Sequence, residues 1–84
     1  MYTAYILQSS RNGKYYIGST DNINNRIVKH NKGYSRYTKG KGPFKLIYRE
    51  DFLTRSEAKK REYHLKSLKN RTAIDNLIMQ DAIV

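Results

Sequence analysis

The chain has 84 residues, of which 38% are hydrophobic, and its 17 Lys and Arg side chains against 7 Asp and Glu give a formal net charge of +10. This length predicts one domain, residues 1–84, with a thin core, and the absence of cysteine excludes disulfides and thiolate metal sites. The N-terminus lacks the charged and apolar regions of a signal peptide, and no apolar run approaches the ~20 residues of a membrane span, so we expect a soluble cytoplasmic protein.

The first two predicted elements are strands joined as a β-hairpin. Residues 2–7 (YTAYIL) and 15–20 (YYIGST) are rich in β-branched and aromatic side chains, a composition typical of strands. The dipeptide Asn12-Gly13 between them is a strong signal for a hairpin turn. We therefore expect an antiparallel pair of strands at the start of the chain.

The length of the turn decides which side chains share a face of this hairpin. A four-residue loop over residues 10–13 sets Leu7 opposite Tyr16 and Tyr5 opposite Gly18, so that the two tyrosines are diagonal neighbours about 7 Å apart. A two-residue turn would place them further apart. Gly18 has no side chain, so the backbone of a ligand can come close beside them. The other two tyrosines of the hairpin fall on the opposite face. The alternative is that all four simply fit a half-buried sheet.

The next element is a helix over residues 21–33, with Asp21 as its N-cap and Gly33 as its C-terminal stop. Its isoleucines face the sheet, and Arg26 and His30 flank that apolar stripe. Their i,i+4 spacing lets these two side chains act at one site. The alternatives are an arginine that only extends its charge into water and a histidine without a functional role.

A basic segment without any acidic residue runs from this helix to Glu50. It includes a long loop, residues 34–44, and tyrosines lie among its cations, which favours nucleic acid as the ligand. The alternative is a basic protein kept in solution by its charge. The predicted nucleic-acid-binding side chains are Lys29, Lys32, Arg36, Lys39, Lys41 and Lys45.

The second half of the chain predicts one strand and two helices. The strand covers residues 45–52, and Thr54 with Glu57 forms a capping box that opens the next helix. A last helix begins at Thr72, where TAID resembles a second box with Asp75 at its far position. The element order is therefore β-β-α-β-α-α, an α+β domain with helices packed on a small sheet.

The helix after Thr54 places a carboxylate on its core-facing side. Glu62 occupies the i+4 position of a pattern that includes Ala58 and Leu65. A buried carboxylate requires a cation. Either Lys59 and Lys66 pair with it at the edge of the helix, or Glu62 holds a hard divalent ion such as Mg²⁺.

These residues together carry a resemblance that covers nearly the whole chain. TAY at residues 3–5 and YIG at residues 16–18 are followed by Arg26, His30 and Glu62. The ordered set resembles the GIY-YIG nuclease superfamily, and most closely its small stand-alone bacterial members. The first motif reads Thr-Ala-Tyr and lacks the glycine and isoleucine of the family pattern.

The resemblance implies a three-stranded antiparallel sheet flanked by helices, together with roles for individual residues. Glu62 matches the metal-binding glutamate, so the implied cofactor is one Mg²⁺ or Mn²⁺ ion, and Gly18 is a structural residue at the site. Many members also carry a late asparagine, for which Asn70 and Asn76 are candidates without an assignment. The implied catalytic side chains are Tyr5, Tyr16, Arg26 and His30.

The expected function is metal-dependent endonucleolytic hydrolysis of DNA phosphodiester bonds, in DNA repair or processing. The tyrosines would serve the attacking water, and the metal on Glu62 the 3′ leaving oxygen. The alternatives are a non-catalytic nucleic-acid-binding module and an adaptor in a repair complex. RNA is the alternative substrate, and a protein partner could supply substrate targeting. A membrane is not expected as a partner, because no helix has a basic amphipathic pattern with a wide apolar face.

Overall fold

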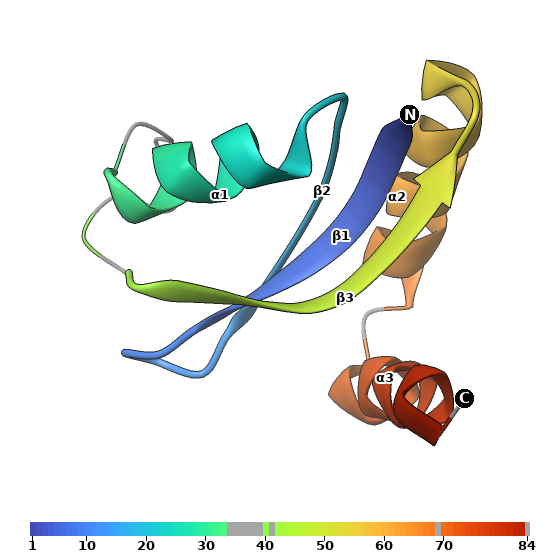
Figure 1. The fold of residues 1–84 in the computed structure, drawn as a ribbon. Helices are drawn as coiled ribbons and strands as arrows, with labels where there is room; N and C mark the ends of the chain where they lie inside the picture. The colour runs from blue at the N-terminus through green and yellow to red at the C-terminus, as the bar shows by residue number, and fades with distance from the viewer. Residues whose placement is uncertain (34–39, 41, 69, 84) are drawn as a thin grey trace.

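The computed structural model describes residues 1–33, 40, 42–68 and 70–83, and over these residues it contains three strands and three helices (Figure 1). Their order, β-β-α-β-α-α, confirms the predicted α+β fold. None of the helices in this part of the chain is long and apolar enough to cross a membrane. The elements are β1 (Tyr2–Ser9), β2 (Tyr15–Thr20), α1 (Ile23–Asn31), β3 (Phe44–Phe52), α2 (Arg55–Ser67) and α3 (Arg71–Ile83).

The sheet is antiparallel and has the strand order β2-β1-β3, so β2 is an edge strand. The predicted hairpin is present, and its loop has four residues. The Ser9 amide donates to the Lys14 carbonyl at 3.0 Å, which leaves the four residues 10–13 in the loop. Tyr5 consequently lies opposite Gly18, and Leu7 lies opposite Tyr16. The predicted register of the hairpin is confirmed.

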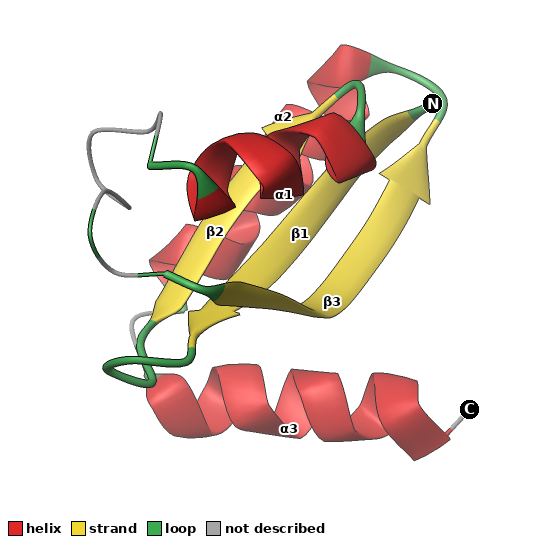
Figure 2. Ribbon diagram, turned by 60° about the vertical axis from the view of Figure 1, so that its left-hand side comes forward, coloured by secondary structure: helices red, strands yellow, loops and turns green. Residues whose placement is uncertain are grey.

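Helices cover the two faces of the sheet separately (Figure 2). On one face α1 packs over a core cluster made of Tyr5, Leu7, Ile23 and Phe44. On the other face α2 and α3 pack over a second cluster made of Ile6, Tyr48, Leu65 and Ile74. Tyr15 packs on this second cluster, and Tyr2 lies beneath the guanidinium of Arg55 from α2, so both tyrosines occupy the face opposite Tyr5 and Tyr16. Consecutive residues of β1 thus serve two cores.

The N-cap of α2 is the predicted residue, whereas the N-cap of α1 differs from the prediction by one residue. Thr54 caps α2, and its hydroxyl accepts a hydrogen bond from the Glu57 amide at 3.2 Å. At α1 the N-cap is Asn22 and not Asp21. The Asn22 side chain accepts from the Asn25 amide at 3.1 Å. Asn and Asp are equally good caps, so two adjacent candidates leave the first turn ambiguous in the sequence.

The start of α3 also corrects a prediction. The helix begins at Arg71, and Asn70 accepts a hydrogen bond from the Thr72 amide at 2.9 Å, so Thr72 is not its cap. Asp75 is free of the supposed capping box and instead accepts a hydrogen bond from the hydroxyl of Tyr15. Asp75 therefore takes part in a contact between two side chains 60 positions apart and not in a local cap.

Candidate active site

A pocket of about 560 Å³ wraps around the edge strand β2 and brings together all five side chains that the sequence singles out. The strands supply Tyr5 and Tyr16, α1 supplies Arg26 and His30, and α2 supplies Glu62. Because side chains alternate along β2, the pocket has walls on both faces of the sheet. Its lining includes Gly18 on the α1 side and Ser19, Lys59 and Lys66 on the α2 side.

The Tyr5 hydroxyl is the centre of a polar cluster on the α1 side. It shares a hydrogen bond of 3.2 Å with His30 Nε2 and accepts a longer one, 3.4 Å, from Arg26 Nε. Tyr5 and His30 are buried, whereas Arg26 is exposed at the pocket rim. Burial and the charge of Arg26 both lower the pKa of His30, so this imidazole is neutral at neutral pH. As their i,i+4 spacing predicted, Arg26 and His30 lie at one place, where both contact the Tyr5 hydroxyl.

The space beside Gly18 has a different occupant from the one expected. A Cβ atom at this position would stand 2.5 Å from the Tyr5 hydroxyl oxygen and 2.7 Å from the ring carbon that bears it. The missing side chain therefore makes room for Tyr5 itself, and not for the backbone of a ligand. Glycine at position 18 allows the hydroxyl of Tyr5 to reach its partners on α1.

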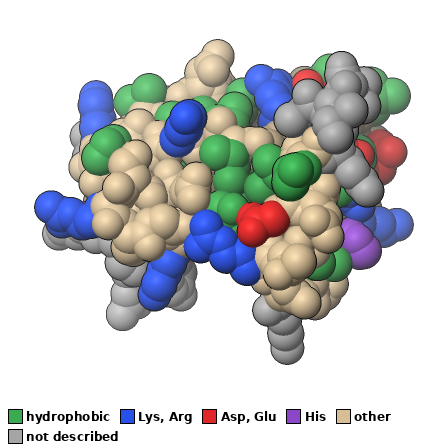
Figure 3. All heavy atoms as spheres, turned by 90° about the horizontal axis from the view of Figure 1, so that it is seen from below, with side chains coloured by type: hydrophobic (Ala, Val, Ile, Leu, Met, Phe, Trp, Pro, Cys, Tyr) green, Lys and Arg blue, Asp and Glu red, His purple; other side chains and the backbone are tan. Residues whose placement is uncertain are grey.

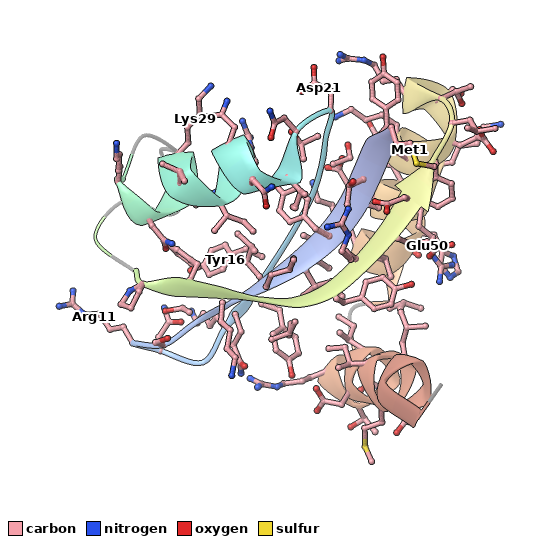
Figure 4. All side chains as sticks on the ribbon, in the orientation of Figure 1. Met1, Arg11, Tyr16, Asp21, Lys29 and Glu50 are labelled. Atoms are coloured by element: carbon pink, nitrogen blue, oxygen red, sulfur yellow. The ribbon has the colours of Figure 1, made fainter. Side chains whose placement is uncertain are left out.

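Tyr16 stands beside this cluster and is held by an aromatic contact that the sequence did not reveal. Its ring meets Phe44 edge to face, with centroids 5.2 Å apart and planes at 88°. Phe44 also lies 6.0 Å from the His30 ring, and its amide donates to the Asn31 side chain at 2.7 Å. Figure 4 shows Tyr16 between α1 and the sheet. Phe44 begins β3 one residue before the predicted strand, and the alternation of that strand places its ring on the α1 side of the sheet.

Glu62 is the acidic side chain on the α2 side of the pocket, and it is 6% exposed. Lys66 donates to its carboxylate at 2.7 Å, and Lys59 donates at 3.4 Å. Ser19 of β2, which the sequence analysis did not single out, donates at 2.6 Å. Burial alone would raise the pKa of Glu62, but the hydrogen bonds from Lys66 and Ser19 and the charges of the two lysines outweigh it and hold the pKa below its usual value. Glu62 is therefore ionised at neutral pH.

The donor set suits a hydrated Mg²⁺ or Mn²⁺ ion and not a metal enclosed by protein ligands. No group of three His, Cys, Asp or Glu side chains that could hold a metal exists among the described residues. Mg²⁺ keeps several waters and commonly binds through one or two carboxylates plus substrate phosphates. Glu62 is such a carboxylate, and the half-exposed side chains of Lys59 and Lys66 have room to move aside. Glu62 is therefore the residue that would hold the ion.

The candidate asparagines do not line this pocket. Asn70 caps α3, as described above. Asn76 lines a separate hollow between α2 and α3, together with Arg61 and His64. Neither is placed to touch a group bound near Tyr5 or Glu62.

The predicted nucleic-acid-binding side chains lie outside the pocket or outside the described residues. Lys29, Lys32 and Lys45 are exposed, and Figure 4 shows Lys29 on the side of α1 away from the sheet. Lys and Arg side chains are also spread over the face shown in Figure 3, where acidic side chains occupy only small patches. The cations that line the pocket are instead Arg26, Lys59 and Lys66. The remaining predicted positions, Arg36, Lys39 and Lys41, lie outside the described residues.

Comparison with known proteins gives consistent matches over this region. The family described as the GIY-YIG catalytic domain matches residues 1–75, a range that includes the four candidate catalytic side chains, Gly18 and Glu62. A UPF0213 protein of Staphylococcus epidermidis is 42% identical over 64 residues, covering 75% of this chain and 77% of that protein. A UPF0213 protein of Halobacterium salinarum is 39% identical over 69 residues, covering 81% and 88%. The solution NMR structure of the UPF0213 protein BH0048 from Bacillus halodurans superposes with a TM-score of 0.57 at 34% identity, covering 94% of this chain and 85% of that one.

Proposed function

Because this chain belongs to the family of GIY-YIG catalytic domains, a family of nucleases, we propose that it is a divalent-metal-dependent endonuclease that hydrolyses phosphodiester bonds of DNA in repair or processing. The observation that carries the proposal is the pocket around β2. The ionised carboxylate of Glu62 lies on one side of this pocket. The Tyr5 hydroxyl, which is hydrogen-bonded to His30 and Arg26, lies on the other. Hydrolysis of a phosphodiester needs an activated water, stabilisation of an anion and assistance to the leaving oxygen.

The α1 side suits the attacking water. Tyr5 takes a proton from the water as its hydroxyl proton passes to the neutral His30 across their 3.2 Å hydrogen bond. The guanidinium of Arg26 stabilises negative charge that develops on the Tyr5 oxygen and on the non-bridging oxygens of the phosphate. Tyr16 orients the water from the adjacent wall, with its ring fixed against Phe44.

The α2 side suits the leaving group. Mg²⁺ or Mn²⁺, when bound, supplies positive charge that neutralises the departing 3′ oxygen. Glu62 would hold the ion, and the hydrogen bond from Ser19 orients the Glu62 carboxylate toward the pocket. Lys59 and Lys66 compensate the charge of Glu62 when no ion is bound, which keeps a buried carboxylate stable in the metal-free protein.

A cleavage panel tests this proposal. Plasmid DNA and single-stranded, duplex, flap and junction oligonucleotides, with an RNA strand for comparison, are incubated with Mg²⁺ or Mn²⁺. We expect Glu62→Ala to lower the cleavage rate at least about 100-fold. Glu57→Ala is the matched control, because it removes a carboxylate from the exposed first turn of the same helix. The metal role fails if folded Glu62→Ala cleaves as fast as the wild type.

The net charge of +10 also favours a second candidate function, a nucleic-acid-binding module without catalysis. Such a module would bind the same class of ligand, nucleic acid, but would require none of the hydrogen bonds around Tyr5. Salt-dependent binding without cleavage under any divalent metal would favour this function over the nuclease.

A further inference from the structure

A second, smaller pocket of about 200 Å³ adjoins the candidate active site at the start of α2. It shares Ser19, Arg26 and Lys59 with the larger pocket, so these side chains contribute to the walls of both. Its own lining adds Arg55, which is the first residue of α2, and Thr20 at the end of β2. It is smaller than the ~300–1,000 Å³ typical of pockets for drug-sized ligands, and its volume suits a small group.

The charge of this pocket is strongly positive. Arg26, Arg55 and Lys59 come from two different helices, and Asp21 is the only acidic side chain among the described residues that line the pocket. Two of the cations already have partners, because Arg26 donates to Tyr5 and Lys59 donates to Glu62. Three cations against one carboxylate favour an anionic ligand.

Arg55 forms no ion pair with any acidic side chain in the described part of the chain, and its contact in the pocket is with the Tyr2 ring. Its guanidinium lies over the Tyr2 ring, 5.5 Å from the centroid. Stacking uses the face of the guanidinium and leaves the N–H groups at its edge to meet an acceptor. The contact with Tyr2 keeps the Arg55 guanidinium at the wall of a positive pocket, where its N–H groups suit the oxygens of a phosphate.

We propose that this second pocket binds a backbone phosphate of the nucleic acid adjacent to the phosphate that is cleaved, with Arg55 as its main ligand. The inference rests on the proposed function, because it takes the larger pocket as the place of the scissile phosphate. Arg26 and Lys59 then stand between two consecutive phosphates. The enzyme therefore requires a strand that continues past the cleaved bond on this side, and a terminal nucleotide there is a poor substrate.

Binding of a fluorescent DNA oligonucleotide, followed by anisotropy in EDTA over a series of salt concentrations, tests the inference without any need for hydrolysis. We expect Arg55→Ala to weaken binding about tenfold and to reduce the salt slope by about one phosphate contact. Arg55→Lys keeps the charge and should retain the slope. Lys60→Ala is the matched control, because Lys60 is exposed on the same helix and does not line the pocket, and we expect it to change affinity less than about twofold.

Two results overturn the inference: equal losses in Arg55→Ala and Lys60→Ala, or an unchanged salt slope in Arg55→Ala. The proposed function can fail separately. If the wild type binds DNA with a salt slope that depends on Arg55 but never cleaves it, the phosphate site is supported and the nuclease proposal is contradicted. Conversely, if the wild type cleaves DNA and Arg55→Ala leaves binding unchanged, only the inference about the second pocket is contradicted.

Discussion

The close approach of Tyr5 to Gly18 makes Gly18→Ala a direct test of the site geometry. The added Cβ would stand 2.5 Å from the Tyr5 hydroxyl oxygen, whereas ordinary contact begins at 3.4 Å, so about 0.9 Å of movement is needed. Tyr5 is only 3% exposed and packs within the core, so its ring cannot move into solvent at low cost. Strain therefore falls on the ring that carries the candidate catalytic hydroxyl.

We expect two separable losses from this substitution. Overpacking of a core costs roughly 1–3 kcal/mol. About 2 kcal/mol lowers the Tm of a domain of this size by about 8–16 °C, which circular dichroism can measure. A shift near 1 Å also breaks the 3.2 Å hydrogen bond between Tyr5 and His30. Under the proposed function it lowers the cleavage rate about 100-fold, measured well below the new Tm.

The Tyr5→Leu background supplies the control for this experiment. It removes the atoms that obstruct a Cβ at position 18, so Gly18→Ala should then cost less than about 0.5 kcal/mol. Two outcomes would refute the reasoning: wild-type Tm and cleavage rate in Gly18→Ala, or the same loss of stability with and without Tyr5→Leu.

Three further predictions concern the same pocket. Tyr16→Phe should lower cleavage at least about 100-fold, while Tyr15→Phe should leave the rate within about twofold, because Tyr15 also lines the pocket but its hydroxyl donates to Asp75, and loss of that hydrogen bond should cost about 1 kcal/mol of stability. Equal rates in the two variants would contradict the role proposed for Tyr16. Because the pKa of His30 is lowered in the folded state, the unfolded chain binds more protons, so acidification below pH ~6.5 should lower the Tm of the wild type more than that of His30→Gln. Tm measured from pH ~7 to ~5 tests this, and parallel pH profiles of the two proteins would contradict it. Addition of EDTA should abolish cleavage by the wild type and leave the Tm unchanged, because Lys59 and Lys66 already neutralise Glu62 in the metal-free protein; a large fall in Tm would indicate that the metal is structural.

Local signals in the sequence predicted the parts of the fold and site that depend on spacing. The Asn12-Gly13 signal predicted the hairpin, and the four-residue loop that the structure shows sets Tyr5 opposite Gly18. Helical periodicity brings Arg26 and His30 to one edge of α1, where both meet the Tyr5 hydroxyl. These predictions succeeded because each follows from the geometry of one element or one turn.

Contacts between distant segments could not be predicted in the same way. Phe44 supports Tyr16 and His30 because β3 pairs with β1, and no local pattern states which ring meets which. Ser19 reaches Glu62 only through the packing of α2 on β2. The role of Gly18 was misjudged for the same reason, since the atoms that fill its space belong to another strand. Side-chain packing in three dimensions, and not propensity, decides these features.

The position of β2 at the edge of the sheet has a consequence for the order in which the protein matures during synthesis. Tyr5, Tyr16, Arg26 and His30 all precede β3, whereas Glu62 lies on α2, which packs on β2 only after the third strand has been made. A nascent chain that has formed the hairpin and α1 still lacks the carboxylate side of the pocket. The complete candidate site therefore exists only once α2 has been made and has docked on β2.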